Sequence, residues 1–206
     1  MDLFTQLGAI YFSAGMWREL SLIGHWVGEA ILVPWARLSS SFTGGNVSFS
    51  DILALLMTSP QQDRMVGEAR DLYARTAHLV CVWSGRTLSS NSFEVDHVIP
   101  YSLWHTNDLW NLMPASRSVN RDKRDKLITR AGLDARKECI IGYWEEAYRE
   151  YPDRFSSELS VRLLGGKFSR ENWKSSAYAS LVEAVETTAA QRGIVRWNLP
   201  EGKGCC

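Results

Sequence analysis

Residues 94–126 read EVDHVIPYSLWHTNDLWNLMPASRSVNRDKRDK and carry the strongest pattern in the chain. A short β-prone run ends in Asp96 and His97, and a helical segment rich in lysine and arginine follows later. Asn111 lies between the two, and Asn120 falls inside the basic segment. We therefore expect a strand, a loop and a basic helix to bring a carboxylate, an imidazole and two amides together.

These residue types predict hydrolysis of a phosphodiester. Carboxylate and amide oxygens, such as those of Asp96 and an asparagine, are ligands that Mg²⁺ and Mn²⁺ prefer. A histidine side chain, with an ordinary pKa of about 6.5, can be neutral at pH 7 and take a proton from water. The metal would offset charge on the phosphate, and the base would generate the nucleophile.

The pattern resembles the ββα-metal core of HNH endonucleases, in particular the HNH domain of RNA-guided DNA nucleases and of related restriction and phage-defence proteins. The family motif Asp-His-(Ile/Val)-(Ile/Val)-Pro matches residues 96–100, the central Asn-Leu matches 111–112, and the final Asn-x-x-Lys matches 120–123. The 14 positions from His97 to Asn111 and the 9 from there to Asn120 are usual for the family. The resemblance covers about residues 79–130.

The resemblance implies a role for each matched residue. His97 would be the general base, while Asp96 and Asn120 would hold one divalent ion, Mg²⁺ or alternatively Mn²⁺. Asn111 would fix the loop between the strands so that His97 points inward. The last residue of the H-N-H pattern is asparagine in this chain, a variant whose amide oxygen favours Mg²⁺ over Zn²⁺.

The basic helix is the expected contact with nucleic acid. Residues 117–137 hold eight basic and three acidic residues, a local excess of positive charge in a chain with 23 of each sign. Lys123 lies one turn beyond Asn120, placed either to meet a phosphate or to tie the helix to the loop. The residues that we expect to contact nucleic acid are Arg117, Arg121, Lys123, Arg124 and Lys126.

Many HNH proteins brace this core with zinc held by two Cys-x-x-Cys pairs. Here the four positions are Cys81, Ser84, Ser116 and Val119. One cysteine cannot form a tetrahedral zinc site, so we expect no structural zinc. Packing must brace the core instead, with aromatic side chains the first candidates: Trp83, Trp104 and Trp110.

Composition sets the class of protein. The chain has 206 residues, and its ordinary apolar and charged content excludes wholesale disorder. Its four cysteines are too few and scattered for a disulfide framework, which favours a cytoplasmic protein. The longest uncharged run near the N-terminus, Leu3–Trp17, is too short for a membrane span, so we expect no membrane association.

We predict a mainly helical α+β fold around a small ββα core, with strands near residues 79–83 and 93–98. The expected regions are a helical docking segment (1–50), a helical flank (51–78), the HNH core (79–130) and a helical region (131–206). The docking segment has tryptophans on opposite helical faces and predicts a homodimer or a partner protein. Pro34 should end or kink its helix, and residues 39–50 should form a flexible connection.

The expected function is therefore a metal-dependent HNH endonuclease acting on DNA, with restriction or phage defence as the biological setting. Three alternatives remain open on the sequence alone. One is a non-catalytic nucleic-acid-binding module that retains the fold, and another is a nuclease acting on RNA. The third is a helical interaction protein, for which the tryptophan-rich N-terminal region is the evidence.

Overall fold

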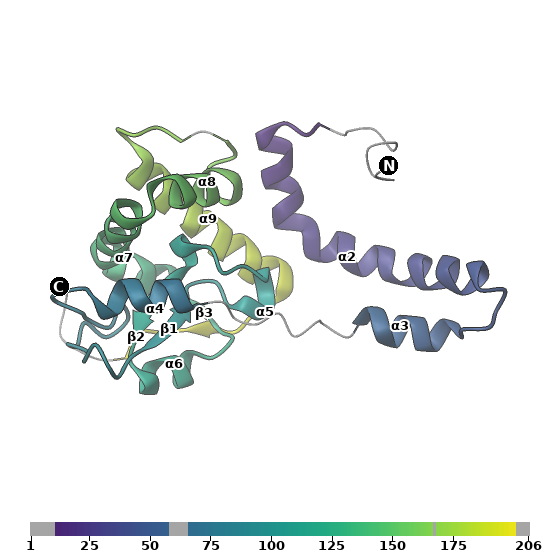
Figure 1. Ribbon diagram of the computed structural model, residues 1–206, viewed down its shortest axis with the longest axis horizontal. Helices are drawn as coiled ribbons and strands as arrows, with labels where there is room; N and C mark the ends of the chain where they lie inside the picture. Colours follow the sequence, from purple (N-terminus) through teal and green to yellow (C-terminus); the bar gives the residue numbers. More distant parts are fainter. Residues whose placement is uncertain (1–10, 58–65, 167, 201–206) are drawn as a thin grey trace. The chain divides into compact units, whose positions relative to one another are not determined.

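The computed structural model describes residues 11–57, 66–166 and 168–200, with the exception of a few side chains near the N-terminus. The chain forms two compact units: one is Glu19–Met65, and the other combines Met1–Arg18 with Val66–Cys206. Apart from Ala36, every buried apolar residue that the structure describes belongs to the larger unit. Helices dominate both units, as Figure 1 shows, which confirms the expected mainly helical α+β class.

A two-stranded sheet and a short helix form the centre of the larger unit. Strand β1 (Glu94–His97) pairs with β2 (Leu112–Ala115) in antiparallel fashion, and helix α6 (Arg117–Lys123) follows directly. Ser116 starts α6 by accepting a hydrogen bond from the Val119 N–H, as an N-cap serine does. Two short helices lie in the connection between the strands: α5 (Tyr101–Trp104) and the 3₁₀ helix η1 (Leu109–Asn111).

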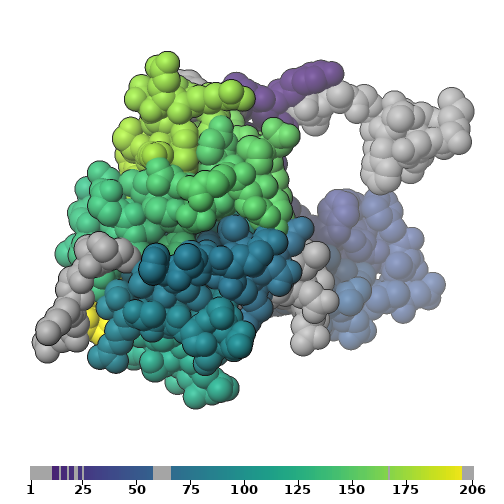
Figure 2. Space-filling view, turned by 60° about the vertical axis from the view of Figure 1, so that its left-hand side comes forward, coloured from purple at the N-terminus to yellow at the C-terminus, as the bar shows by residue number. Residues whose placement is uncertain are grey.

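Longer helices and aromatic side chains support this centre. The supporting helices are α4 (Gly67–Ala74), α7 (Arg130–Glu150), α8 (Pro152–Arg162) and α9 (Trp173–Arg192). In Figure 2 the blue segment that contains α4 lies against the green helices α7 and α8. The indole of Trp144, which is fully buried, donates to the Trp110 carbonyl at 2.7 Å and so links α7 to η1. Burial raises the pKa of Tyr73, and its neutral hydroxyl donates to the Leu112 carbonyl of β2 at 2.6 Å.

The expected bracing tryptophans occupy the core in different ways. Trp83 and Trp110 are fully buried. Trp104 is half-buried, packs edge-on against Trp110 and donates its indole N–H to Thr188 of α9 at 3.0 Å. Packing of large aromatic side chains therefore joins the sheet, the connection and the C-terminal helices into one core.

Some local expectations were wrong. Residues 79–83 are not a strand, because only Val80 forms a β-bridge, to Thr87, before the chain turns at Gly85 in the left-handed region. A second, parallel pair of short strands, β3 (Leu127–Ile128) and β4 (Arg196–Trp197), was not expected. Its two strands lie about 70 residues apart in sequence and are too short to leave a periodic signal.

The smaller unit is built from α2 (Ala14–Phe42), which begins just before it, and α3 (Phe49–Met57). Helix α2 continues through Pro34 to Phe42, so the proline does not end it, and α3 starts inside the expected flexible connection. Sixteen of the eighteen large apolar side chains that are exposed in the described part of the chain lie between Tyr11 and Met57. In the ranges that the structure describes, no helix combines the length and apolar character needed to cross a membrane.

Candidate active site

His97 closes strand β1 and is almost fully buried. Its Nε2 lies 3.1 Å from the Oδ1 of Asn107, and its ring packs edge-on against Tyr101 with the ring centres 5.6 Å apart. The Asn107 amide therefore holds the His97 ring by its Nε2.

Asp96, the residue before His97, lies in a buried ion pair with Lys123 of α6. The Lys123 Nζ is 3.2 Å from Asp96 Oδ1 and 3.1 Å from Oδ2, and it also donates to the His97 carbonyl at 2.6 Å. The Trp83 indole donates to Asp96 Oδ2 at 2.6 Å. Lys123 has no exposed surface and so ties α6 to β1, which is one of the two roles expected from the sequence. We do not propose that it contacts nucleic acid.

Asn111 is fully buried and holds the chain that follows His97. Its Oδ1 accepts from the Ile99 N–H at 2.8 Å, and its Nδ2 donates to the Ile99 carbonyl at 2.9 Å. Its own carbonyl accepts from the Val98 N–H at 2.8 Å. Three hydrogen bonds thus fix the main chain just after β1. The position of this main chain helps to orient the side chain of His97.

Asn120 faces β1 from α6 and contacts a residue that the sequence argument did not single out. Its Nδ2 donates to Glu94 Oε2 at 2.7 Å, while Arg117 Nε lies 3.5 Å from Glu94 Oε1. Because Glu94 holds the amide nitrogen, the amide oxygen of Asn120 is the atom available to a ligand. Glu94 and Asp96 occupy alternate positions of β1, so both carboxylates lie on the strand face that α6 covers.

The other basic residues of the helix lie at the surface. Arg117, Arg121 and Arg124 are exposed, and Lys126 is half-buried. Arg124 adopts a left-handed conformation at the end of α6, with φ of 50°, and its side chain donates to the Arg121 carbonyl. Lys126 donates to the Asp122 carbonyl at 3.1 Å. These side chains leave positive charge on the helix that carries Asn120.

The four positions at which related proteins hold zinc still meet in space. The Cys81 Sγ accepts a hydrogen bond from the Ser116 N–H at 3.3 Å, so the two loops contact each other directly. Ser84, Ser116 and Val119 line one common pocket. A buried thiol, two hydroxyls and a valine offer too few soft donors for a tetrahedral zinc site.

The donor atoms around α6 fit a hard divalent ion better than zinc. Among the described residues, no three His, Cys, Asp or Glu side chains lie close enough together to hold a metal. Mg²⁺ commonly uses one or two protein oxygens and completes its shell with water and phosphate. Asp96 and Asn120 meet that smaller requirement, although the Lys123 ammonium now covers the Asp96 oxygens.

Sequence reasoning missed three residues of this site: Glu94, Asn107 and Trp83 as a partner of Asp96. Glu94 could have been noticed, because it shares the strand face of Asp96 two positions earlier. Asn107 gave no signal, since it lies in an irregular loop whose path depends on tertiary packing.

Removing one charge of the buried ion pair should destabilise the protein more than removing both charges. Lys123→Ala leaves the Asp96 carboxylate buried without its cation, so we expect the free energy of unfolding in urea to fall by about 3–5 kcal/mol. The double substitution Asp96→Leu with Lys123→Met removes both charges and should recover most of that loss. Equal destabilisation by the single and double substitutions would contradict a charge-pair origin.

Comparison with known proteins agrees with this geometry. Residues 81–128, which span the turn at Cys81, both central strands and α6, match the family model described as HNH endonuclease. No curated protein and no solved structure matches the chain. The matched segment contains the buried His97, Asn111 with its hydrogen bonds to Ile99, and Asn120, so residues 81–128 are similar to an HNH endonuclease domain, and this match supports a nuclease.

Proposed function

We propose that the chain hydrolyses phosphodiester bonds in DNA with a divalent ion of the Mg²⁺ class. The observation that carries the proposal is that β1 ends in Asp96 and His97 and that α6, which bears Asn120, is tied to this strand by the Asn120–Glu94 and Lys123–Asp96 contacts. A domain that only bound nucleic acid would have no need for a proton acceptor beside two oxygen ligands. This argument favours catalysis over the binding-module alternative.

His97 is the general base in this proposal. Its imidazole takes the proton of the attacking water, and Asn107, whose Oδ1 lies 3.1 Å from Nε2, keeps the ring oriented. Asn111 acts indirectly, because its two hydrogen bonds to Ile99 fix the main chain that orients His97. Both asparagines are thus positioning residues.

Asp96 and Asn120 are the proposed ligands of the divalent ion. When bound, the ion would offset the negative charge of the phosphate and of the leaving oxygen. Lys123 supplies positive charge to Asp96 in the present structure, at 3.1 and 3.2 Å from its two oxygens. Glu94 keeps the amide of Asn120 turned so that its oxygen is available.

DNA is the proposed substrate because exposed arginines flank Asn120 on α6 and double-stranded DNA is a dense line of phosphates. Restriction or phage defence in the cytoplasm is the proposed setting. It rests on the kind of HNH protein that residues 94–126 resemble and on the few scattered cysteines, of which Cys81 and Cys139 are buried.

Plasmid nicking tests this proposal directly. We expect nicking that requires Mg²⁺ or Mn²⁺ and that His97→Ala reduces by about 10²–10⁴-fold, the usual contribution of a general base. His78→Ala is the matched control, because His78 is exposed and has no role in the site. Equal nicking by wild type and His97→Ala would contradict the role of His97 as the general base. Cleavage of RNA but not of plasmid would support the RNA alternative.

The exposed apolar helices of the smaller unit suggest a second copy of the chain as their partner, and we propose a homodimer through α2. Trp26, Val33 and Trp35 are about half exposed, which is costly for a free surface of this extent. Glu29, Val33 and Arg37 lie at intervals of four on one helix face. Antiparallel pairing of two α2 helices about Val33 therefore places Glu29 of each copy opposite Arg37 of the other.

A charge-reversal series tests the dimer. Size-exclusion chromatography with light scattering should give twice the chain mass for wild type, and Glu29→Arg should shift the equilibrium toward monomer because it sets two like charges against each other. The double substitution Glu29→Arg with Arg37→Glu should restore the dimer. A monomeric wild type would exclude the second copy and leave a different protein as the partner of this surface.

A further inference from the structure

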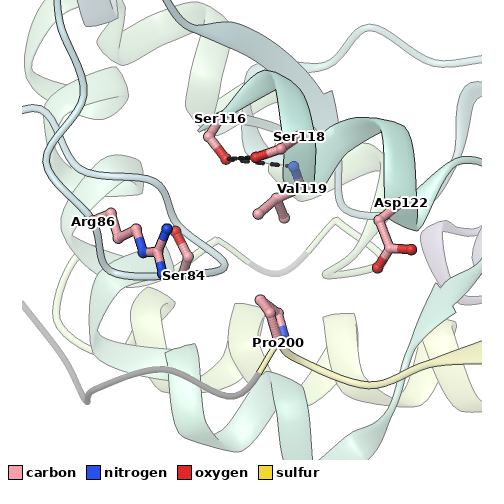
Figure 3. A pocket seen from close by; sticks show the side chains of 7 residues that line it. All are labelled: Ser84, Arg86, Ser116, Ser118, Val119, Asp122 and Pro200. Atoms are coloured by element: carbon pink, nitrogen blue, oxygen red, sulfur yellow. Dashed lines mark hydrogen bonds between the residues drawn. The ribbon is translucent and has the colours of Figure 1, made fainter.

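A pocket of about 240 Å³ lies beside α6. Figure 3 shows its walls: Arg86 and Ser84 come from the turn after Cys81, four residues come from α6 and its cap, and Pro200 closes the opposite side. The family domain ends at residue 128, so Pro200 is a contribution of the C-terminal region. Asn120, the proposed metal ligand, and Lys123, which ties α6 to β1, project from the same helix toward β1 and do not line the pocket.

One polar group of this pocket is buried without a partner. The Ser84 residue is 7% exposed, and its hydroxyl has no hydrogen-bond partner among the described residues. A buried hydroxyl left unpaired costs about 1–3 kcal/mol, and a ligand that hydrogen-bonds to Ser84 would offset this cost. Ser116 and Ser118 add two hydroxyls that lie 3.3 Å from each other.

The charges of the pocket are separated. Arg86 is exposed, and its guanidinium has no acidic partner in the part of the chain that the structure describes. Asp122 stands at the other end in Figure 3, with Val119 and Pro200 between the two charges. The Trp197 indole donates to Asp122 Oδ2 at 2.8 Å and holds that carboxylate at its end. An anionic group therefore has one favourable place, beside Arg86 and the serine hydroxyls.

We propose that this pocket binds a phosphate group of the nucleic-acid backbone next to the cleavage site. Arg86 would supply the charge, the three serines would donate hydroxyls, and Val119 with Pro200 would contact the adjoining sugar. The inference rests on the proposed function, since it assumes that nucleic acid lies along α6. It adds a contact from outside the basic helix, and this contact fixes the register of the strand relative to Asn120.

Salt dependence of binding measures this contact without requiring cleavage. The protein for the measurement carries His97→Ala, and a short DNA duplex is titrated in metal-free buffer at several salt concentrations. Arg86→Gln should reduce the slope of log K against log salt by about 0.9, the value expected for one lost phosphate contact on duplex DNA. Arg75→Gln is the matched control, because Arg75 is an exposed arginine that pairs with Glu150 at 2.9 Å on another face.

Ser84→Ala gives a second readout that a structural role would not produce. Removal of an unpaired buried hydroxyl should keep or raise the melting temperature, whereas binding of the duplex should weaken about threefold to tenfold for one lost hydrogen bond. A serine that mattered only for folding would show the opposite, a lower melting temperature with unchanged affinity.

The outcomes separate this inference from the proposed nuclease function. Unchanged slope and affinity in both Arg86→Gln and Ser84→Ala would overturn the phosphate site, even if plasmid nicking succeeds. Altered binding without any nicking would support the site while contradicting the nuclease proposal. Inorganic phosphate serves as a further probe: a rise in melting temperature that Arg86→Gln abolishes, together with an unchanged DNA slope, would assign the pocket to a free phosphate and overturn the backbone contact.

Discussion

The buried ion pair between Asp96 and Lys123 is the constraint on which the site depends. It joins the end of β1 to the last turn of α6, and the same ammonium holds the His97 carbonyl. Desolvating two charges offsets much of their attraction, so the pair adds little net stability. The ion pair matters because it positions α6 against β1: the two charges pair only when the helix lies in this place. That placement also sets Asn120 against Glu94, so one interaction aligns the proposed ligand and the base.

A second set of contacts holds together the two loops at which the family resemblance would place zinc. Two loops must stay together for β1 and α6 to keep their relation, and here the Cys81 sulfur accepts directly from the Ser116 N–H. Aromatic residues connect these loops to the rest of the core. Trp83 contacts Trp197 edge-on, and the Trp144 indole donates to the Trp110 carbonyl. Residues of the C-terminal region thus help to hold these loops in place. The pocket at Arg86 lies beside the serines of the same loops.

The sequence predicted the fold class and the segment that matches the family, because both follow from short-range patterns. The spacing of Asp96-His97, Asn111 and Asn120 and the basic helix are local signals. The residues that orient these groups are not local: Asn107 lies in an irregular loop, and the Trp83 indole reaches Asp96 across the core. The β3–β4 pair joins segments far apart in the chain through two residues each. The roles of the matched residues stay predictions until they are measured.

Only some of the basic side chains of this neutral chain are exposed and unpaired enough to contact nucleic acid. The excess of positive charge between residues 117 and 137 overstates the charge offered to nucleic acid, because Lys123 and Arg136 are buried and Arg130 pairs with Asp134 at 2.9 Å. What remains at the surface is a few arginines on α6. An added contact from Arg86 would come from the adjacent turn, so the positive surface would extend along the path of a bound strand. For the proposed DNA substrate we expect so few contacts to give modest and salt-sensitive affinity, and we expect the position of a cut to depend more on the geometry around Asn120 than on the binding affinity.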